Sequence, residues 1–306
     1  MAESLRSIPG VCEVEVLRGG LASPAAEPQV LFEVAHGATR AHHFDALRAE
    51  LRGDYAPELR EFFFVNTDVG APELAWSTAR RLVEHRPRSV ALVVRCLLPR
   101  TFIDCNRTIA PDAAPSGSAP GELTPGLPPW VVDARDRALL LQRYVAYRDV
   151  VTAAFERVCG RGGIGLCVHT YAPRSIEVAV DRDVVASLRA AYAADRIGTW
   201  KLRAGIDLIT HDPDGRLLAG RALADHAEAE FEGAGFDVVR NGTYSLHPST
   251  QAHAFAVRFA GRTLCFEVRR DLLLDEFVPF RELLPDEAKV ARLATPLTTA
   301  LLQTTV

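Results

Sequence analysis

The chain has 306 residues, of which 48% are hydrophobic and 24% are charged, and its formal net charge is -4. This balance is typical of a soluble globular protein with a substantial core, and it argues against a nucleic-acid-binding surface, which would need excess positive charge. No stretch approaches the roughly 20 apolar residues that a membrane-spanning helix requires. Residues 1–10 lack the apolar stretch of a secretory signal, so we expect a cytoplasmic protein.

Apolar segments alternate with longer amphipathic segments along most of the chain. The apolar segments predict strands at residues 29–35, 62–65, 89–97, 163–169, 208–210 and 263–268. The amphipathic segments predict helices at residues 44–52, 72–84, 135–159, 181–192, 222–233 and 251–261. The strand segments are continuously apolar, which indicates burial on both faces of a sheet. The pattern predicts a three-layer α/β/α fold, in which helices cover both faces of a mostly parallel or mixed sheet.

Residues 109–129 interrupt this pattern because they are rich in Pro, Gly, Ser and Ala and show no periodicity. A long irregular segment in a compact domain is usually either disordered or functional. Since the segment closely follows Asn106 and Arg107, we interpret it as a mobile rim or lid and not as a linker. The chain shows no obvious internal repeat, and we expect residues 1–306 to form one domain.

The cysteines are spaced too irregularly to suggest a disulfide framework or a thiolate metal site. No Cys-x-x-Cys pair occurs, and most of the cysteines lie in apolar, strand-like segments. We therefore expect reduced, buried thiols. The six positions are Cys12, Cys96, Cys105, Cys159, Cys167 and Cys265.

Two histidines each end an apolar segment, which makes them candidate metal ligands. His36 follows residues 30–35, and His169 follows residues 164–168. Ligands bind at the carboxyl ends of strands in open α/β sheets, and a catalytic zinc usually takes three protein ligands and leaves one position for water. Asp68 is our first choice for the third ligand, although it could instead cap the helix predicted from residue 72. Each histidine taken alone could equally be a core or turn residue.

Other residues near His36 compete with Asp68 for the place of third ligand. They are His42, His43 and Asp45. The two histidines are more typical of a solvated loop or helix start than of a metal site.

Asn106 and Arg107 end another strand-like stretch and are candidate substrate-binding residues. The planar guanidinium of Arg107 can bind a carboxylate through two hydrogen bonds, and Asn106 can orient the same group or a carbonyl. The alternative is that Arg107 is buried and paired with a structural acid such as Asp104. Arg100 and Arg174 could provide further contacts to a carboxylate or to a developing oxyanion.

Glu267 lies between Phe266 and Val268 in the last predicted strand. Acids are rarely buried without a partner or a function, and a glutamate beside a metal site is the usual general base in metal-assisted amide hydrolysis. The alternative is an ion pair with a nearby arginine. The turn at residues 241–244 could present Asn241 or Tyr244 to a pocket, although a plain turn explains it equally well.

Taken in chain order, these stretches resemble the motifs of the N-formylglutamate amidohydrolase family. Its members carry Pro-His-Ser-Gly, Asp-x-Asn-Arg preceded by an Arg, Asp-x-His-Ser, an Asn-x-Pro-Tyr-like turn and Glu-hydrophobic-x-Arg. The matching stretches here are Ala35-His36-Gly37-Ala38, Arg100 with Asp104-Cys105-Asn106-Arg107, Cys167-Val168-His169-Thr170, Asn241-Gly242-Thr243-Tyr244 and Glu267-Val268-Arg269-Arg270.

The resemblance implies a fold like that of the zinc carboxypeptidases (phosphorylase/hydrolase-like), with a mixed sheet. It also implies one zinc ion per chain, hydrolysis of the amide bond of an N-formyl or other N-acyl amino acid, and a small-molecule substrate. Ala35 stands in place of the family's Pro, and Cys167 stands in place of its Asp. Such differences would reshape the pocket for another acyl-amino acid or a peptide-like amide.

Three other interpretations compete with a zinc amidohydrolase. The first is a carboxypeptidase-like or other amide hydrolase that acts on a different substrate. The second is a catalytically degenerate protein that binds a carboxylate ligand. The third is a cysteine-based enzyme that uses Cys105 or Cys167, although no ordered Cys–His signature supports it. None of them suggests a nucleic-acid or membrane partner.

Overall fold

The structure is a computed structural model, and it describes residues 5–304. Its centre is a seven-stranded sheet in the order β1-β3-β2-β4-β7-β5-β6. The four central strands β3, β2, β4 and β7 are parallel, whereas β1 and β5 run antiparallel to their inner neighbours. The strands are β1 (Cys12–Arg18), β2 (Val30–Val34), β3 (Val90–Cys96), β4 (Ile164–Tyr171), β5 (Ile206–Ile209), β6 (Val238–Arg240) and β7 (Thr263–Arg269).

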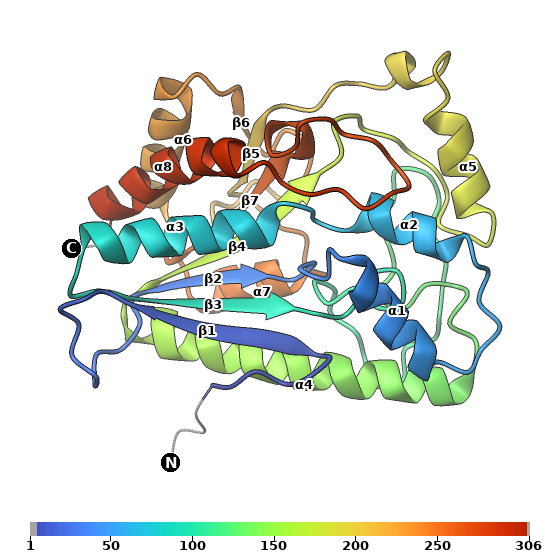
Figure 1. Ribbon diagram of the computed structural model, residues 1–306, viewed down its shortest axis with the longest axis horizontal. Helices are drawn as coiled ribbons and strands as arrows, with labels where there is room; N and C mark the ends of the chain where they lie inside the picture. The colour runs from blue at the N-terminus through green and yellow to red at the C-terminus, as the bar shows by residue number, and fades with distance from the viewer. Residues whose placement is uncertain (1–4, 305–306) are drawn as a thin grey trace.

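Helices cover both faces of this sheet, as predicted. Helices α3, α6 and α8 pack on one face and α4 and α7 on the other, while α1, α2 and α5 gather beyond one end of the strands (Figure 1). The helices are α1 (Ala41–Glu50), α2 (Leu59–Asn66), α3 (Ala71–His85), α4 (Ala134–Val158), α5 (Val184–Ala191), α6 (Arg221–Gly233), α7 (Gln251–Arg258) and α8 (Glu287–Thr304). The predicted three-layer α/β/α architecture with a mixed sheet is confirmed.

The apolar strands fill two cores because successive side chains of a strand point to opposite faces. Leu31 of β2 packs in the cluster that contains Tyr144 of α4, whereas its neighbour Phe32 packs in the cluster that contains Leu74 of α3. All five residues of β2 are buried. The continuous apolar character of the strands therefore reflects coverage on both sides.

One predicted strand is wrong. Residues 62–65 belong to the helix α2, in which Phe62, Phe63 and Phe64 are all buried. A short apolar run does not distinguish a strand from a buried turn of helix, because every residue of the run can be buried in either structure.

Among residues 5–304, two strands and one α-helix lie outside the predicted segments. Few residues of the edge strands β1 and β6 are fully buried. Neither strand therefore stands out in the sequence as a continuous run of buried apolar residues. Helix α8 contains Pro296, a residue that usually argues against a helix interior. It nevertheless packs its apolar side against α3 and α6.

Some predictions stay open. One of them is that residues 1–306 form a single domain. Residues 1–4 and 305–306 lie outside the described part of the chain. Among residues 5–304, no helix combines the length and the apolar character needed to cross a membrane.

Candidate metal centre and active-site cleft

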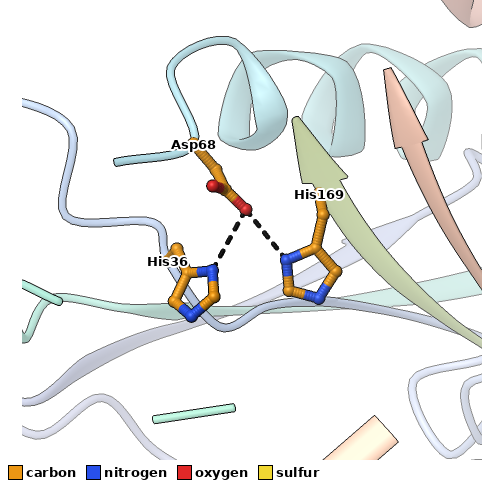
Figure 2. A group of neighbouring side chains, drawn as sticks. All are labelled: His36, Asp68 and His169. Atoms are coloured by element: carbon orange, nitrogen blue, oxygen red, sulfur yellow. Dashed lines mark hydrogen bonds and ion pairs between the residues drawn. The ribbon is translucent and has the colours of Figure 1, made fainter. Parts of the chain in front are cut away.

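Two histidines and one aspartate converge near the carboxyl ends of the central strands (Figure 2). His36 lies in the turn after β2, His169 lies in β4 near its end, and Asp68 lies between α2 and α3. Oδ2 of Asp68 is 3.2 Å from Nδ1 of His36 and 2.8 Å from Nδ1 of His169. All three residues are buried, and their candidate ligand atoms lie within 4.8 Å of one another. The structure thus brings the three predicted metal ligands together.

Two glycines help the backbone to place these residues. A Cβ atom on Gly37 would lie 2.5 Å from the side chain of Arg95, so the turn that carries His36 needs a residue without a side chain. Gly70 has a φ of 90° and precedes α3, and no side chain caps this helix. Asp68 is therefore not the helix cap, and its carboxylate points to the histidines instead.

A second layer of polar groups holds the outer sides of the three residues. Nε2 of His36 is 2.7 Å from Oδ1 of Asp104, and Nε2 of His169 is 3.5 Å from Nδ2 of Asn106. The buried Arg270 approaches the other carboxylate oxygen of Asp68 at 3.5 Å. Such contacts orient histidine ligands and fix which ring nitrogen faces the metal. Here Nδ1 of both rings faces the shared oxygen of Asp68.

This donor set suits a zinc ion. Two imidazole nitrogens and one carboxylate oxygen are ligands that zinc accepts, at about 2.0–2.2 Å each. Tetrahedral ligands at that range lie about 3.3–3.6 Å apart. The separation of 3.2 Å between His36 and Asp68 is close to this range, whereas the separation of 2.8 Å between His169 and Asp68 is shorter. Burial alone would raise the pKa of Asp68, but the neighbouring His36 and His169 lower it well below its ordinary value. The carboxylate is thus ionised, as a metal ligand must be.

Glu267 lies beside this cluster on β7, where it is the register partner of His169. Its Oε2 atom is buried and has no hydrogen-bond partner among residues 5–304. Burial, together with the neighbouring Asp68, raises the pKa of Glu267 to about 7 against the opposing effect of His169. A carboxylate with a free oxygen and a pKa near neutrality is suited to accept and return a proton.

Asp104 connects the metal cluster to the predicted arginines. Its Oδ2 atom accepts a hydrogen bond from Nε of Arg100 at 2.9 Å, and Nε of Arg107 lies 3.9 Å away. Arg107 makes closer contacts with Thr124, whose carbonyl oxygen is 2.8 Å from Nε and whose Oγ1 is 3.2 Å from Nη2. Burial alone would raise the pKa of Asp104, but Arg100 and His36 lower it well below its ordinary value. Asp104 is therefore a permanent anion beside His36.

A cleft opens over these residues as two adjoining cavities. The larger has a volume of about 450 Å³ and the smaller about 140 Å³, and Glu267, Arg100 and Tyr244 line both. Residues 122–124 also line both cavities. The irregular segment at 109–129 therefore lines part of the cleft, while its role as a mobile rim or lid stays a prediction.

Comparison with known protein families agrees with this geometry. A family model described as "FGase: N-formylglutamate amidohydrolase" matches residues 30–274. The chain belongs to the N-formylglutamate amidohydrolase family. A search of curated protein sequences finds no match.

Two solved structures share the fold of this family member. One is an N-formylglutamate amidohydrolase from Ralstonia eutropha JMP134, with a TM-score of 0.57 and 21% identity over 95% of this chain and 96% of that one. The other is gene product Atu2144 from Agrobacterium tumefaciens, with a TM-score of 0.53 and 21% identity over 95% and 93%. A metallo-carboxypeptidase from Burkholderia cenocepacia gives a TM-score of 0.33 at 13% identity, covering 99% of this chain and 67% of that one, and supports no conclusion.

Two predicted substrate contacts of this amidohydrolase family member lie away from the cleft. Arg174 donates a hydrogen bond to the carbonyl oxygen of Trp200 at 2.9 Å, and it lines neither cavity. Oδ1 of Asn241 accepts hydrogen bonds from the backbone of Thr210 and His211, which secures the end of β5. These two residues serve local structure in this conformation.

The remaining candidates for a metal ligand also lie elsewhere. Asp45 on α1 forms an exposed ion pair with Arg60 at 2.8 Å. The rings of His42 and His43 contact each other on the same helix, tilted by 56°, and neither joins the buried cluster. Among the described residues, Asp68 is the acid that completes the pair of histidines.

Tyr244 is brought to the cleft together with an arginine that the sequence analysis did not identify. The Tyr244 hydroxyl is 3.2 Å from Nη2 of Arg203, and the Arg203 guanidinium lies over the rings of Tyr171 and Tyr244 at 5.0 and 5.7 Å. The turn that carries Tyr244 is fixed by Asp207, which accepts hydrogen bonds from the backbone of Thr243 and its neighbour. Arg203 precedes β5 in an irregular segment, where no periodicity marks it.

The cysteines do not form a nucleophilic site. All six are buried and free, and all lie within the described residues. Burial raises the pKa of the Cys105 and Cys167 thiols well above the ordinary value, so neither thiol is ionised at neutral pH. Since the thiolate is the nucleophile, the cysteine-based alternative finds no support in the geometry.

Proposed function

We propose that this chain is a zinc-dependent amidohydrolase that cleaves the amide bond of an N-acyl amino acid. The observation that carries the proposal is the buried meeting of His36, His169 and Asp68, beside a glutamate whose carboxylate has a free oxygen. Membership of the N-formylglutamate amidohydrolase family supports the same chemistry.

The proposed roles follow from where each side chain lies. His36, Asp68 and His169 would hold the ion, which when bound supplies a Lewis acid and lowers the pKa of water beside it. Glu267 removes a proton from the attacking water and returns one to the departing amine nitrogen. The new carbon–oxygen bond forms first and the carbon–nitrogen bond then breaks, so one water is consumed for each acid and amine released.

Arginines on the cleft wall would bind the charged parts of the substrate. Asn106 and Arg107 line the smaller cavity, where the guanidinium can hold the amino-acid carboxylate. Arg100 lines both cavities beside Asp104, and we assign it to the carbonyl oxygen on which negative charge develops. Tyr244 lines the same junction and would contact the amide from the opposite wall.

Two features favour catalysis over a purely ligand-binding role. A degenerate binding protein would have no need of a complete set of metal ligands, each oriented from behind by a second polar group. It would also gain nothing from leaving Oε2 of Glu267 buried without a partner, because such an atom costs stability. Both features suit a hydrolase.

The test is the metal content of the purified protein, followed by its activity. Elemental analysis should find about one zinc ion per chain in the wild type, and the ion should be lost in both H36A and H169A. The matched control is H42A, since His42 is exposed on α1 and should not affect the ion. Absence of bound metal after reconstitution, or full activity of chelator-washed H36A, would contradict the proposal.

A further inference from the structure

We infer that the acyl group removed by this enzyme is large and mostly apolar, and is not a formyl group. The inference rests on the proposed function and specifies its substrate class. It follows from the unequal sizes of the two cavities, from the residues that line each one, and from the place where the cavities meet.

The first argument is volume. A formyl group contains a single carbon atom, whereas the larger cavity has a volume of about 450 Å³. Cavities of roughly 300–1,000 Å³ are typical of sites that enclose a drug-sized ligand. The smaller cavity, at about 140 Å³, leaves room for little more than an amino acid. A formyl substrate would therefore leave most of the cleft filled with water.

The second argument is the chemistry of the larger cavity. Part of its wall is apolar and comes from segments that are distant in sequence, including Phe62 of α2, Trp130, Val178, and Val184 and Leu188 of α5. Helices α2 and α5 both lie beyond the end of the sheet (Figure 1). Water gains few hydrogen bonds on such a wall, so an apolar group that displaces it binds favourably.

Charged residues also line the larger cavity, among them Glu122 and Glu177 on irregular segments, and others lie at the edge of the sheet. Arg203 precedes β5 and Arg270 follows β7, and these two strands are antiparallel neighbours, so both residues come from the same edge of the sheet. Asp68 lies there as well, in contact with Arg270. Asp68 and Arg270 thus adjoin the reacting centre, while helix α5, which supplies Val184 and Leu188, lies beyond the end of the sheet (Figure 1).

The third argument is direction. Asn106 and Arg107 line only the smaller cavity, whereas Glu267 and Arg100 line both cavities. If Arg107 holds the amino-acid carboxylate, the amide must cross the junction at Glu267. The acyl group then enters the larger cavity and extends towards its apolar wall.

The test compares acyl groups on a fixed amino acid. We would measure kcat/KM of the zinc-loaded enzyme for the N-formyl, N-acetyl, N-hexanoyl and N-phenylacetyl derivatives of glutamate, and repeat the series with glutamine and leucine. Burial of each added methylene group should raise kcat/KM about threefold to fourfold. We expect the hexanoyl and phenylacetyl derivatives to exceed the formyl derivative at least about tenfold.

A cavity-filling variant tests whether the larger cavity causes the preference for large acyl groups. V178W places an indole in the larger cavity and should lower the ratio of phenylacetyl to formyl kcat/KM at least about tenfold. A179W is the matched control, because Ala179 is the adjacent residue and does not line the cavity, so the ratio should not change. I176W fills the same cavity from the same segment and replaces V178W if that variant does not fold.

Binding provides a readout that does not depend on turnover. Titration calorimetry should detect phenylacetate binding to the wild type, with weaker binding to V178W and no detectable binding of formate. Preference for the formyl derivative, or equal losses for all derivatives in V178W and I176W, would overturn the inference and leave the proposed function intact. Failure to hydrolyse any of these amides would overturn both.

Discussion

His169 and Glu267 are register partners on the adjacent parallel strands β4 and β7, and Asp207 on β5 is the register partner of Glu267 on its other side. Three polar side chains therefore form a row across three strands at the same level of the sheet. Backbone pairing sets the position of Glu267, so its carboxylate needs no side-chain anchor. That arrangement lets a buried oxygen face the cleft without a partner.

Replacing Glu267 by glutamine should abolish proton transfer without disturbing the metal. A positioned general acid–base typically contributes about 10²–10⁴ in rate, so we expect E267Q to lose kcat by that factor. Glutamine has nearly the same shape, and Glu267 is not one of the three ligands, so zinc content should equal that of the wild type. A variant that keeps half of the wild-type kcat, or loses its zinc, would contradict the assigned role.

The pH profile should report the same carboxylate. Burial raises the pKa of Glu267 to about 7, and only the ionised form can accept a proton. Activity should therefore fall as the pH decreases through this pKa, by about tenfold per pH unit in kcat/KM. A bound cation would favour the ionised form of Glu267, so the pH at which activity falls would lie below 7. The residual activity of E267Q should not show this fall at low pH. An equal fall in E267Q would mean that another group causes it.

Much of the site could be predicted because its residues end strands. His36, His169 and Glu267 come from three neighbouring strands that all run in the same direction. The carboxyl ends of parallel strands meet at one edge, so side chains that are far apart in sequence become neighbours there. Continuous apolar runs reveal those strands, and the polar residue that ends or interrupts each run is visible in the sequence alone.

The rest of the site lies in irregular segments, where spacing carries no such information. The sequence predicts a strand at residues 62–65, yet Asp68 follows the helix α2, and it reaches the cluster because α2 packs beyond the sheet. Thr124 contacts Arg107 across 17 positions of irregular chain, and Arg203 meets Tyr244 across 41. Such contacts depend on the path of a loop in three dimensions, which neither periodicity nor a short motif specifies.

Asp104 should control metal affinity although it does not touch the ion site. It holds Nε2 of His36 at 2.7 Å, and contacts of this kind typically account for about 10–100-fold in metal affinity. We therefore expect D104N to weaken zinc binding by that factor, as measured by competition with a chelator. D45N is the control, since Asp45 forms an exposed ion pair with Arg60. Unchanged zinc affinity in D104N would mean that His36 needs no outer partner.

Thr124 should hold the rim of the cleft in place. Its Oγ1 accepts hydrogen bonds from Arg100 at 2.9 Å and Arg107 at 3.2 Å. T124V keeps the shape but removes this acceptor, which should cost about 1–3 kcal/mol of unfolding free energy and accelerate hydrogen exchange in residues 121–125. KM should rise more than kcat falls, because the rim positions substrate and takes no part in proton transfer. The control is T108V, which lies at an exposed site and should change none of these quantities. Hydrogen exchange in T124V at the wild-type rate would contradict the proposed role of the Thr124 hydroxyl.

Glu33 should make the stability of the fold depend on pH. This buried residue of β2 accepts a hydrogen bond from the hydroxyl of Tyr147, yet burial raises its pKa above the ordinary value. The folded state therefore binds a proton that the unfolded state releases. The resulting stability is complete below the unfolded-state pKa and is lost as the pH rises towards the folded-state pKa, by up to about 1.4 kcal/mol per pH unit.

Urea unfolding of E33Q over a range of pH isolates this contribution. Glutamine stays neutral, so the unfolding free energy of E33Q should fall less steeply than that of the wild type as the pH rises. The difference between the two proteins should thus move in favour of E33Q with increasing pH. E58Q changes an exposed glutamate and should follow the wild-type curve. Parallel curves for E33Q and the wild type would show that Glu33 is ionised in the folded protein, despite its burial.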